Sequence, residues 1–183
     1  MVSPTQAKGN WVVDPAHTSV EFAGKHMMVT TVRGRFAKFE ANVEFNESDP
    51  TLSKVEARIY TDSVDTKEPK RDTHLRSADF LESERFPLMV FKSKAVKPAG
   101  NKRYHLIGDL TIKDVTKEIA LDVEYTGLAK TPWGTTVAGF AGEGNISRKE
   151  FGLNWNVALE AGGWLVSDNI KISIESELIK QPQ

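Results

Sequence analysis

Residues 104–125 decide the fold class, and they read YHLIGDLTIKDVTKEIALDVEY. Every second residue from Leu106 to Ile112 is apolar or glycine, and the residues between them are mostly polar. After a turn near Asp114 the same alternation resumes and runs as far as Tyr125. A period of two is typical of strands that bury one face and expose the other. Two such strands joined by a short turn predict antiparallel pairing.

The same pattern extends over most of the chain. The further strand candidates are residues 19–22, 38–45, 54–61, 89–95, 138–146, 153–160 and 170–178. Short turns between successive strands predict an all-β fold, an extended antiparallel β-barrel of about eight strands. A barrel of that size is filled by side chains or holds one small ligand. A two-sheet sandwich is the rival, and the long apolar face of residues 170–178 favours the closed barrel because an open edge would aggregate.

Length and composition fit one domain, which we place at residues 11–180 behind a disordered leader at residues 1–10. The net charge of −1 and the lack of a basic stripe predict no nucleic-acid partner. No apolar run approaches the roughly 20 residues of a membrane span, so we expect no stable membrane insertion. The absence of cysteine excludes disulfides and thiolate chemistry.

The first ten residues, MVSPTQAKGN, lack the apolar region of a secretory signal. A native start at Met1 predicts a cytoplasmic protein, whereas a chain that begins where a signal was removed predicts a periplasmic or secreted one. The residues do not separate these two locations.

One segment breaks the alternation. Residues 71–87, RDTHLRSADFLESERFP, are highly charged, and their apolar positions recur at a spacing of three. Pro69 at the first turn predicts a short helix over roughly residues 69–82, with Thr66 as a cap and Pro87 as a stop. The helix would lie across an open end of the barrel, as a movable lid or as a plug of the core. Truncating a lid residue would speed ligand release at little cost in stability, whereas truncating a plug residue would destabilise the fold.

Few polar residues are candidates for catalysis, metal binding or contact with a polar head group. The four histidines show no i, i+4 pair of the kind that binds zinc on a helix, so we predict no metal site and no cofactor. His17 either hydrogen-bonds backbone in a turn or makes a polar contact at the barrel mouth. Arg71 either pairs with neighbouring surface charges or points at the head group of a ligand.

The strongest indication of function in the sequence is the large number of apolar side chains that are predicted to face the barrel interior. Those predicted to face the interior are Ile59, Phe91, Leu110, Ile112, Val123, Tyr125, Phe140, Trp155, Ile172 and Ile174, and the helix adds Leu75, Phe80 and Leu81 at the entrance. In a solid barrel these side chains pack together. If they line a tunnel, each methylene of a bound chain contributes about 0.8 kcal/mol.

Several motifs, in order, resemble the YceI-like family of bacterial proteins that bind polyisoprenoid and other long lipophilic ligands. Residues 71–87 are similar to the family's R-D-x-H-L-[RK]-S-x-D-F-[FL] motif, with Leu81 in place of the more usual second Phe. The other matching stretches are WVVDPAHTSVEFAGKHMM (11–28), VRGRFAKF (32–39), FPLMVFKSK (86–94), residues 104–121, WGTTVAGFAGEGNISRKEFGLNW (133–155) and AGGWLVSDNIKISIESEL (161–178). The resemblance implies a lipocalin-like barrel with an elongated apolar interior, and commonly export.

Three functions follow from these observations. The first is non-enzymatic carriage or storage of a polyisoprenoid, an isoprenoid quinone or a similar amphiphilic lipid, with a homodimer as a plausible assembly for a small carrier. The second is an enzyme acting on a lipophilic substrate, with His17, His74 or an adjacent carboxylate as acid or base. The third is a filled-core β module for protein interactions.

Overall fold

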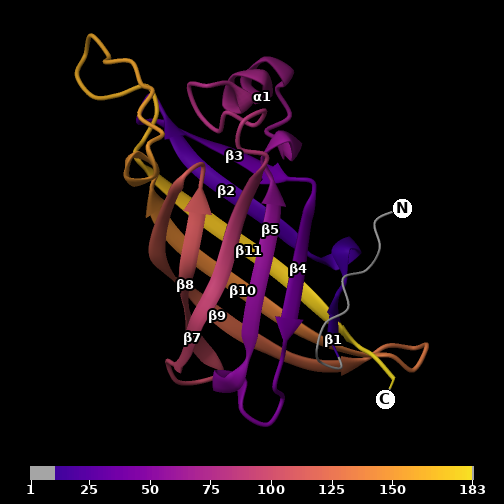
Figure 1. The fold of residues 1–183 in the computed structure, drawn as a ribbon. Helices are drawn as coiled ribbons and strands as arrows, with labels where there is room; N and C mark the ends of the chain where they lie inside the picture. Colours follow the sequence, from indigo (N-terminus) through magenta and orange to yellow (C-terminus); the bar gives the residue numbers. More distant parts are fainter. Residues whose placement is uncertain (1–10, 183) are drawn as a thin grey trace.

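One antiparallel sheet contains every strand of the structure, a computed structural model that describes residues 11–182 (Figure 1). The predicted leader, residues 1–10, lies outside the described residues. The strands are β1 (Trp11–Val13), β2 (Ser19–His26), β3 (Thr30–Phe36), β4 (Phe39–Glu44), β5 (Lys54–Tyr60), β6 (Val64–Asp65), β7 (Leu88–Pro98), β8 (Arg103–Ile112), β9 (Val115–Lys130), β10 (Thr136–Ser147) and β11 (Asn169–Lys180). The helix α1 spans Pro69–Arg76, and 3₁₀ turns span Pro15–His17, Pro50–Leu52, Thr61–Ser63 and Arg148–Phe151.

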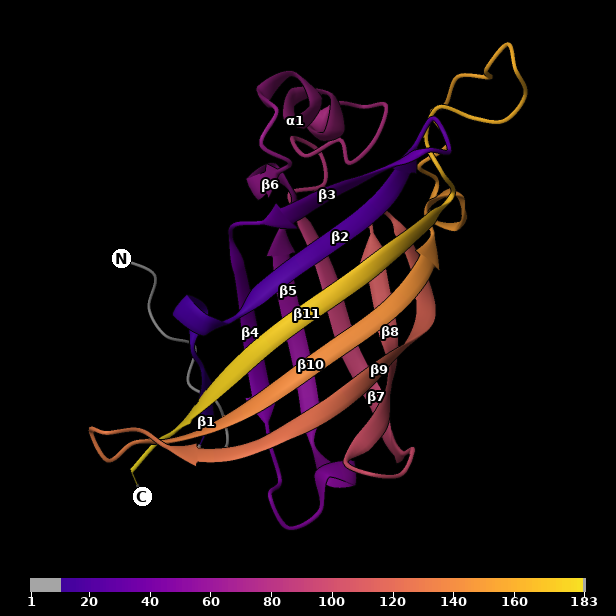
Figure 2. The same cartoon turned by 180° about the vertical axis from the view of Figure 1, so that it is seen from behind.

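The sheet curls into an elongated barrel. Its strands follow the order β4-β5-β7-β8-β9-β10-β11-β2-β3-β6, and β1 pairs with β11. Figure 2 shows β9, β10, β11 and β2 wrapping diagonally across one side while β4, β5, β7 and β8 form the other. The two ends of the sheet meet at the β3–β4 corner, where the amide of Ala37 donates to the carbonyl of Ser63 and the amide of Tyr60 donates to that of Lys38. The antiparallel lipocalin-like barrel predicted from the sequence is therefore confirmed.

The strands number eleven among the described residues, against about eight predicted. β1 and β6 span only three and two residues, too few to show an alternation in the sequence. β3, TTVRGRF, buries a glycine and an aromatic rather than a run of aliphatic side chains, so its alternation is faint. The difference arises from short or atypical strands and leaves the topology unchanged.

Residues 153–160 do not form the predicted strand. They lie in a loop, residues 152–168, that follows β10 and is tied down by side chains rather than by a ladder of backbone hydrogen bonds. The Asn156 side chain accepts from the Val166 amide and donates to the Val166 carbonyl, and an isolated bridge joins Ala158 to Trp164. The alternation still has structural meaning, because Leu153 and Trp155 both face the barrel interior.

The predicted helix is shorter than expected. α1 ends at Arg76, and residues 77–86 continue as turns, so the Ala78 side chain is exposed instead of sharing a helical face with Leu75. The cap also differs, because the Glu68 side chain, not that of Thr66, accepts from the backbone at the helix start. Among the described residues, no helix has both the length and the apolar character needed to cross a bilayer.

Candidate ligand-binding cavity

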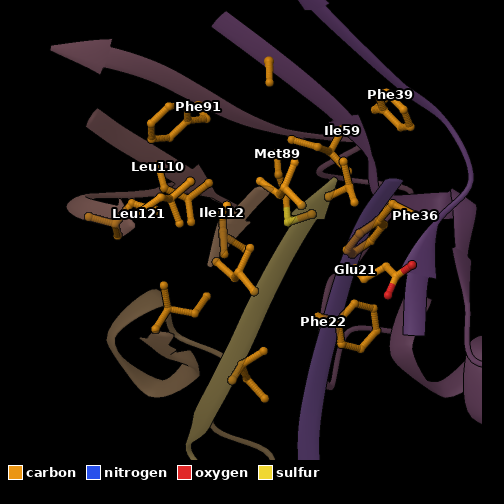
Figure 3. A pocket seen from close by; sticks show the side chains of 18 of the residues that line it. Glu21, Phe22, Phe36, Phe39, Ile59, Met89, Phe91, Leu110, Ile112 and Leu121 are labelled. Atoms are coloured by element: carbon orange, nitrogen blue, oxygen red, sulfur yellow. The ribbon is translucent and has the colours of Figure 1, made fainter. Parts of the chain in front are cut away.

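A cavity of about 540 Å³ lies inside the barrel. Inward-facing side chains from β2, β4, β5 and β7–β11 form its wall, because the period-two alternation sends every second side chain of each strand inward. Figure 3 shows this wall, in which Phe91, Leu110, Ile112 and Met89 face Phe22 and Phe36 across the cavity. A volume of this size falls within the range of small-molecule sites in proteins.

Most of the residues proposed from the sequence line this one cavity. They are Ile59, Leu75, Phe80, Leu81, Phe91, Leu110, Ile112, Val123, Phe140, Trp155, Ile172, Ile174 and Arg71. Tyr125 and His17 do not line it. Several other wall residues were not proposed as site residues. Phe22 lies on a strand that the alternation identified, whereas Phe36 and Val64 belong to the atypical β3 and the two-residue β6.

Tyr125 lies behind the cavity wall, in an aromatic cluster at the end of the barrel remote from α1. Its ring stacks on Phe140 at 5.2 Å between centroids, and Phe45 lies 5.5 Å from both Tyr125 and Trp11. A register shift between Gly139 and Phe140 changes the pairing of β10 with β9 at this point. Burial raises the pKa of the Tyr125 phenol. The cluster closes this end of the cavity with aromatic rings, of which Phe45 and Phe140 line the cavity and Tyr125 does not.

His17 lies outside the barrel, in the 3₁₀ turn after β1. Its Nδ1 lies 2.7 Å from Asp14 Oδ2 and 3.9 Å from Glu177 Oε1. The hydrogen bond with Asp14 raises the pKa of His17, and the same bond lowers the pKa of Asp14. The three groups come within 4.8 Å of one another, which the sequence could not indicate because Glu177 is remote in the chain. The exposed His17 imidazole is hydrogen-bonded to the Asp14 side chain outside the barrel and does not line the cavity.

The opposite end of the cavity is closed by the segment that includes α1. Phe80 is 6% exposed and Leu81 is 7% exposed, so both side chains are buried although the residues around them are mostly charged. The His74 ring meets Phe80 edge to face at 5.0 Å and Trp155 at 4.6 Å. The His74 Nε2 atom lies 2.8 Å from Asp79 Oδ2. Two segments that are distant in sequence thus form one aromatic cap.

A buried carboxylate anchors the helix beside this cap. Asp72 Oδ1 accepts from both the amide and the hydroxyl of Thr66, at 2.8 and 2.6 Å. The Arg71 guanidinium donates to the Thr66 hydroxyl and to the Thr66 carbonyl. Arg71 and Asp72 are therefore both bonded to Thr66, and the structure gives Arg71 no ion pair with a neighbouring surface charge among the described residues. Arg71 lines the cavity, but two of its donors fix the loop in front of the helix.

Arg148 is the polar residue that sequence reasoning missed. It lies in the turn after β10, is buried, and lines the cavity. Its guanidinium donates to four backbone carbonyls, those of Ser167, Leu153, Trp155 and Val166. Burial lowers the pKa of Arg148, yet a guanidinium remains charged at any physiological pH. The side chain holds loop 152–168 in place and puts a positive charge at the α1 end of the cavity.

Charge is distributed unevenly along the cavity. The basic, acidic and histidine side chains in its wall are Lys25, His26, Arg71, His74, Arg148 and Glu21. All but Glu21 belong to the α1 end, where β2 finishes and loop 152–168 begins. Glu21 is exposed, and it is the one carboxylate that lines the cavity within the described part of the chain. The cavity is therefore cationic at one end and apolar at the other.

Comparison with known proteins places this fold in a family. The model of the YceI-like domain matches residues 11–178. A UPF0312 protein of Staphylococcus aureus strain RF122 is 40% identical over 169 residues, which cover 92% of this chain and 96% of the relative. The corresponding UPF0312 protein of strain USA300 is 38% identical over the same length.

Solved structures give the same result. A Campylobacter jejuni YceI protein is 31% identical with a TM-score of 0.75, over 86% of this chain and 90% of that one. Burkholderia cenocepacia BcnA is 25% identical with a TM-score of 0.77, over 90% and 98%. A polyisoprenoid-binding domain from Saccharophagus degradans has a TM-score of 0.64 at 12% identity, over 94% and 99%, and so shares the fold. The family match over nearly all of the described residues shows that this chain belongs to the YceI-like family.

Proposed function

We propose that this protein binds one long lipophilic ligand inside the barrel and carries or stores it without chemical change. The ligand class is a polyisoprenoid, an isoprenoid quinone or a similar amphiphile. The observation that carries the proposal is the continuous apolar cavity, which reaches from the aromatic cap at α1 to the aromatic cluster at the other end. The polyisoprenoid-binding domain of Saccharophagus degradans, which has the same fold, supports the same ligand class.

The shape of the cavity favours a chain over a compact ligand. On β11 the cavity-lining residues run from Ile170 to Leu178, eight steps along the strand. At about 3.4 Å per residue, the rise of an antiparallel strand, this is a length of roughly 27 Å. Each methylene transferred from water into such a wall contributes about 0.8 kcal/mol, so a long chain is held tightly without a charged partner.

The uneven charge suggests how the ligand is oriented. A guanidinium has five N–H donors, and Arg148 directs four of them at backbone carbonyls, which leaves one. A polar or anionic head group near Arg148 would accept this donor inside a site of low dielectric, where charge-assisted hydrogen bonds are strong. The apolar tail would then lie toward Phe140 and Leu178. We therefore propose a head group at the α1 end.

Catalysis on the ligand is the alternative. His74 and Asp79 form a pair beside the cavity, which is the arrangement an acid/base mechanism would use. Both side chains are partly exposed, and the His74 ring is packed between Phe80 and Trp155. A structural role in the cap accounts for this packing, so the binding function is preferred.

The test is organic extraction of purified protein followed by mass spectrometry of the extract. One chain-like lipid per protein, recovered unchanged after incubation at working temperature, supports the carrier. Recovery of a modified lipid would favour the enzyme. An empty extract, together with no uptake of lipid delivered from detergent, would favour the filled-core module. Sedimentation of the same sample would test the predicted homodimer.

A further inference from the structure

Exposed apolar side chains gather at the α1 end of the barrel, on two neighbouring loops. We call this set the mouth patch, and its members are Met27, Met28, Val29, Val157 and Trp164. Val29 is 78% exposed, Met28 64% and Trp164 50%. In both overall views the β2–β3 turn and loop 152–168 project side by side beyond the barrel wall (Figures 1 and 2).

The two loops form one unit. The Met27 amide donates to the carbonyl of Leu165 at 2.8 Å, and the Ser167 amide donates to that of Lys25 at 3.0 Å. The Met28 side chain lies against Gly163, where an added Cβ would collide with the Met28 sulfur. The mouth patch is therefore a fixed surface and not a set of side chains that happen to be exposed.

The β2–β3 turn, at the centre of the mouth patch, has a backbone conformation that is unfavourable for the residues that occupy it. Met27 and Met28 have φ angles of 50° and 62°, and the Val29 amide closes the turn on the His26 carbonyl. Positive φ angles at two successive turn residues are unfavourable for side chains such as methionine and favour Asn, Asp or Gly. Here two methionines occupy these positions, and their side chains gain little burial within the chain in return. A contact outside the chain is the natural use of such side chains.

The mouth patch adjoins the cavity. Leu165 and Val166, which follow Trp164, line the cavity wall, and so do Lys25 and His26, which precede Met27. A long lipid that crossed open water to reach this wall would be disfavoured roughly fourfold for every methylene exposed. If a surface next to the cavity contacted the phase that supplies the lipid, the lipid could enter the cavity without exposing its methylenes to water.

We propose that the mouth patch docks on the surface of a lipid bilayer, so that the ligand passes between bilayer and cavity without crossing water. This inference rests on the proposed function for the identity of the cargo. If the apolar tail of the lipid enters the cavity first, the head group enters last and stays at the cationic end of the cavity, beside Arg148. Apolar tips on projecting loops suit shallow insertion among head groups better than they suit the broad face of a stable dimer.

The charges around the mouth patch support attachment through apolar contact. The Lys149 ammonium lies 5.4 Å above the Trp164 ring, an arrangement that suits the boundary between head groups and acyl chains. Lys25 at the end of β2 adds a second exposed cation, while Glu150 in the 3₁₀ turn and Glu160 in loop 152–168 balance the two cations. Because the net charge is close to zero, we expect binding to vary little with salt.

The test is flotation with vesicles of phosphatidylcholine and phosphatidylglycerol in equal parts. The variant is Met28→Ser/Val29→Ser/Trp164→Ser. The matched control is Leu52→Ser/Trp133→Ser, which removes exposed apolar side chains, one of them 88% exposed, at the opposite end of the barrel. We expect the mouth variant to lose vesicle partition by about tenfold or more and the control to match the wild type, with all melting temperatures alike.

Lipid loading separates this inference from the proposed function. The inference is supported if the mouth variant fills normally from detergent micelles but slowly from vesicles. It is overturned if the mouth variant floats and fills like the wild type, although lipid binding would then stand. If the wild type floats through the mouth patch yet never takes up lipid, docking stands and the carrier function fails. If the wild type does not float and the same substitutions turn a dimer into a monomer, a second copy covers the patch and the inference is wrong.

Discussion

The ring of Phe80 lies 5.4 Å from the ring of Trp155, centroid to centroid, and both rings line the same end of the cavity. One ring comes from the turns after α1 and the other from loop 152–168. The end of the barrel is thus closed by two segments that pack on each other. The sequence left a lid and a plug as alternatives, and the burial of Phe80 and Leu81 is what a plug requires.

Truncating Phe80 is expected to destabilise the fold. Phe80→Ala removes a buried ring from a cluster with His74 and Trp155, and we expect a loss of about 3–5 kcal/mol in the free energy of unfolding. Urea unfolding followed by circular dichroism measures it, with Leu52→Ala as an exposed control that should cost less than about 0.5 kcal/mol. A loss near zero for Phe80→Ala, together with faster lipid release, would instead mean that the segment is a movable lid.

A charge placed inside the barrel should abolish binding. Ile112→Glu buries an isolated carboxylate among apolar side chains, at a cost of several kcal/mol, and we expect loss of ligand together with a large loss of stability. The control is Ala120→Glu on the outer face of neighbouring β9, which should be tolerated. Lys113 is unsuitable as a control, since its side chain is mostly buried and lies 3.2 Å from Glu82. Retention of ligand and stability by Ile112→Glu would show that the assigned faces are reversed.

Arg148 is expected to be essential for loop 152–168. Arg148→Met keeps most of the side-chain volume but leaves the carbonyls of Leu153, Trp155, Val166 and Ser167 without this donor. Each carbonyl that stays buried and unpaired costs about 1–3 kcal/mol, so we expect a total loss of at least about 2 kcal/mol. Hydrogen exchange should report faster opening of residues 153–167. Unchanged protection of this loop would mean that other contacts hold it.

The pair formed by His17 and Asp14 predicts a small pH dependence of stability. The raised pKa of His17 contributes stability below about pH 6.5 that is lost as pH rises through its folded value. The lowered pKa of Asp14 contributes stability above about pH 3.8 that is lost as pH falls through its folded value. The contribution of the pair is therefore largest between these limits. His17→Gln should lower the melting temperature within this window and reduce the fall in melting temperature at its edges, and it should have little further effect in an Asp14→Asn background. An unaltered profile would contradict the assignment.

The sequence predicted most of the barrel because its signal is local. Alternation in β8, β9 and β11 identifies both the strand and its inward face, so the pattern alone places Leu110, Ile112 and Ile172 on the side where the cavity lies. The same local signal misled at residues 153–160, where the ladder is replaced by hydrogen bonds from Arg148 and Asn156 to distant backbone groups.

The misses at the site have the same origin. Burial of Asp72 and Arg148 depends on partners that only the folded chain brings together, since carbonyls from loop 152–168 surround Arg148. Tyr125 follows the alternation and pairs across the sheet with Phe140, yet it packs in the aromatic cluster with Phe45 and Phe140 beyond the end of the cavity. A pattern with a period of two indicates which face a side chain takes, but not how far along the barrel the cavity extends.

Filling the cavity tests the central claim, that the ligand occupies the barrel interior, without unfolding the protein. Gly142 lines the cavity, and a Cβ added there would meet no atom closer than Val123 Cγ2 at 3.7 Å, so Gly142→Leu extends into free space. The measurement is mass spectrometry of the lipid extracted from equal amounts of wild type, Gly142→Leu and the outward-facing control Ala141→Leu. We predict one lipid chain per protein in the wild type and control, and little or none in Gly142→Leu, with its melting temperature maintained or raised. An equal lipid yield from all three proteins would contradict a ligand site inside the barrel.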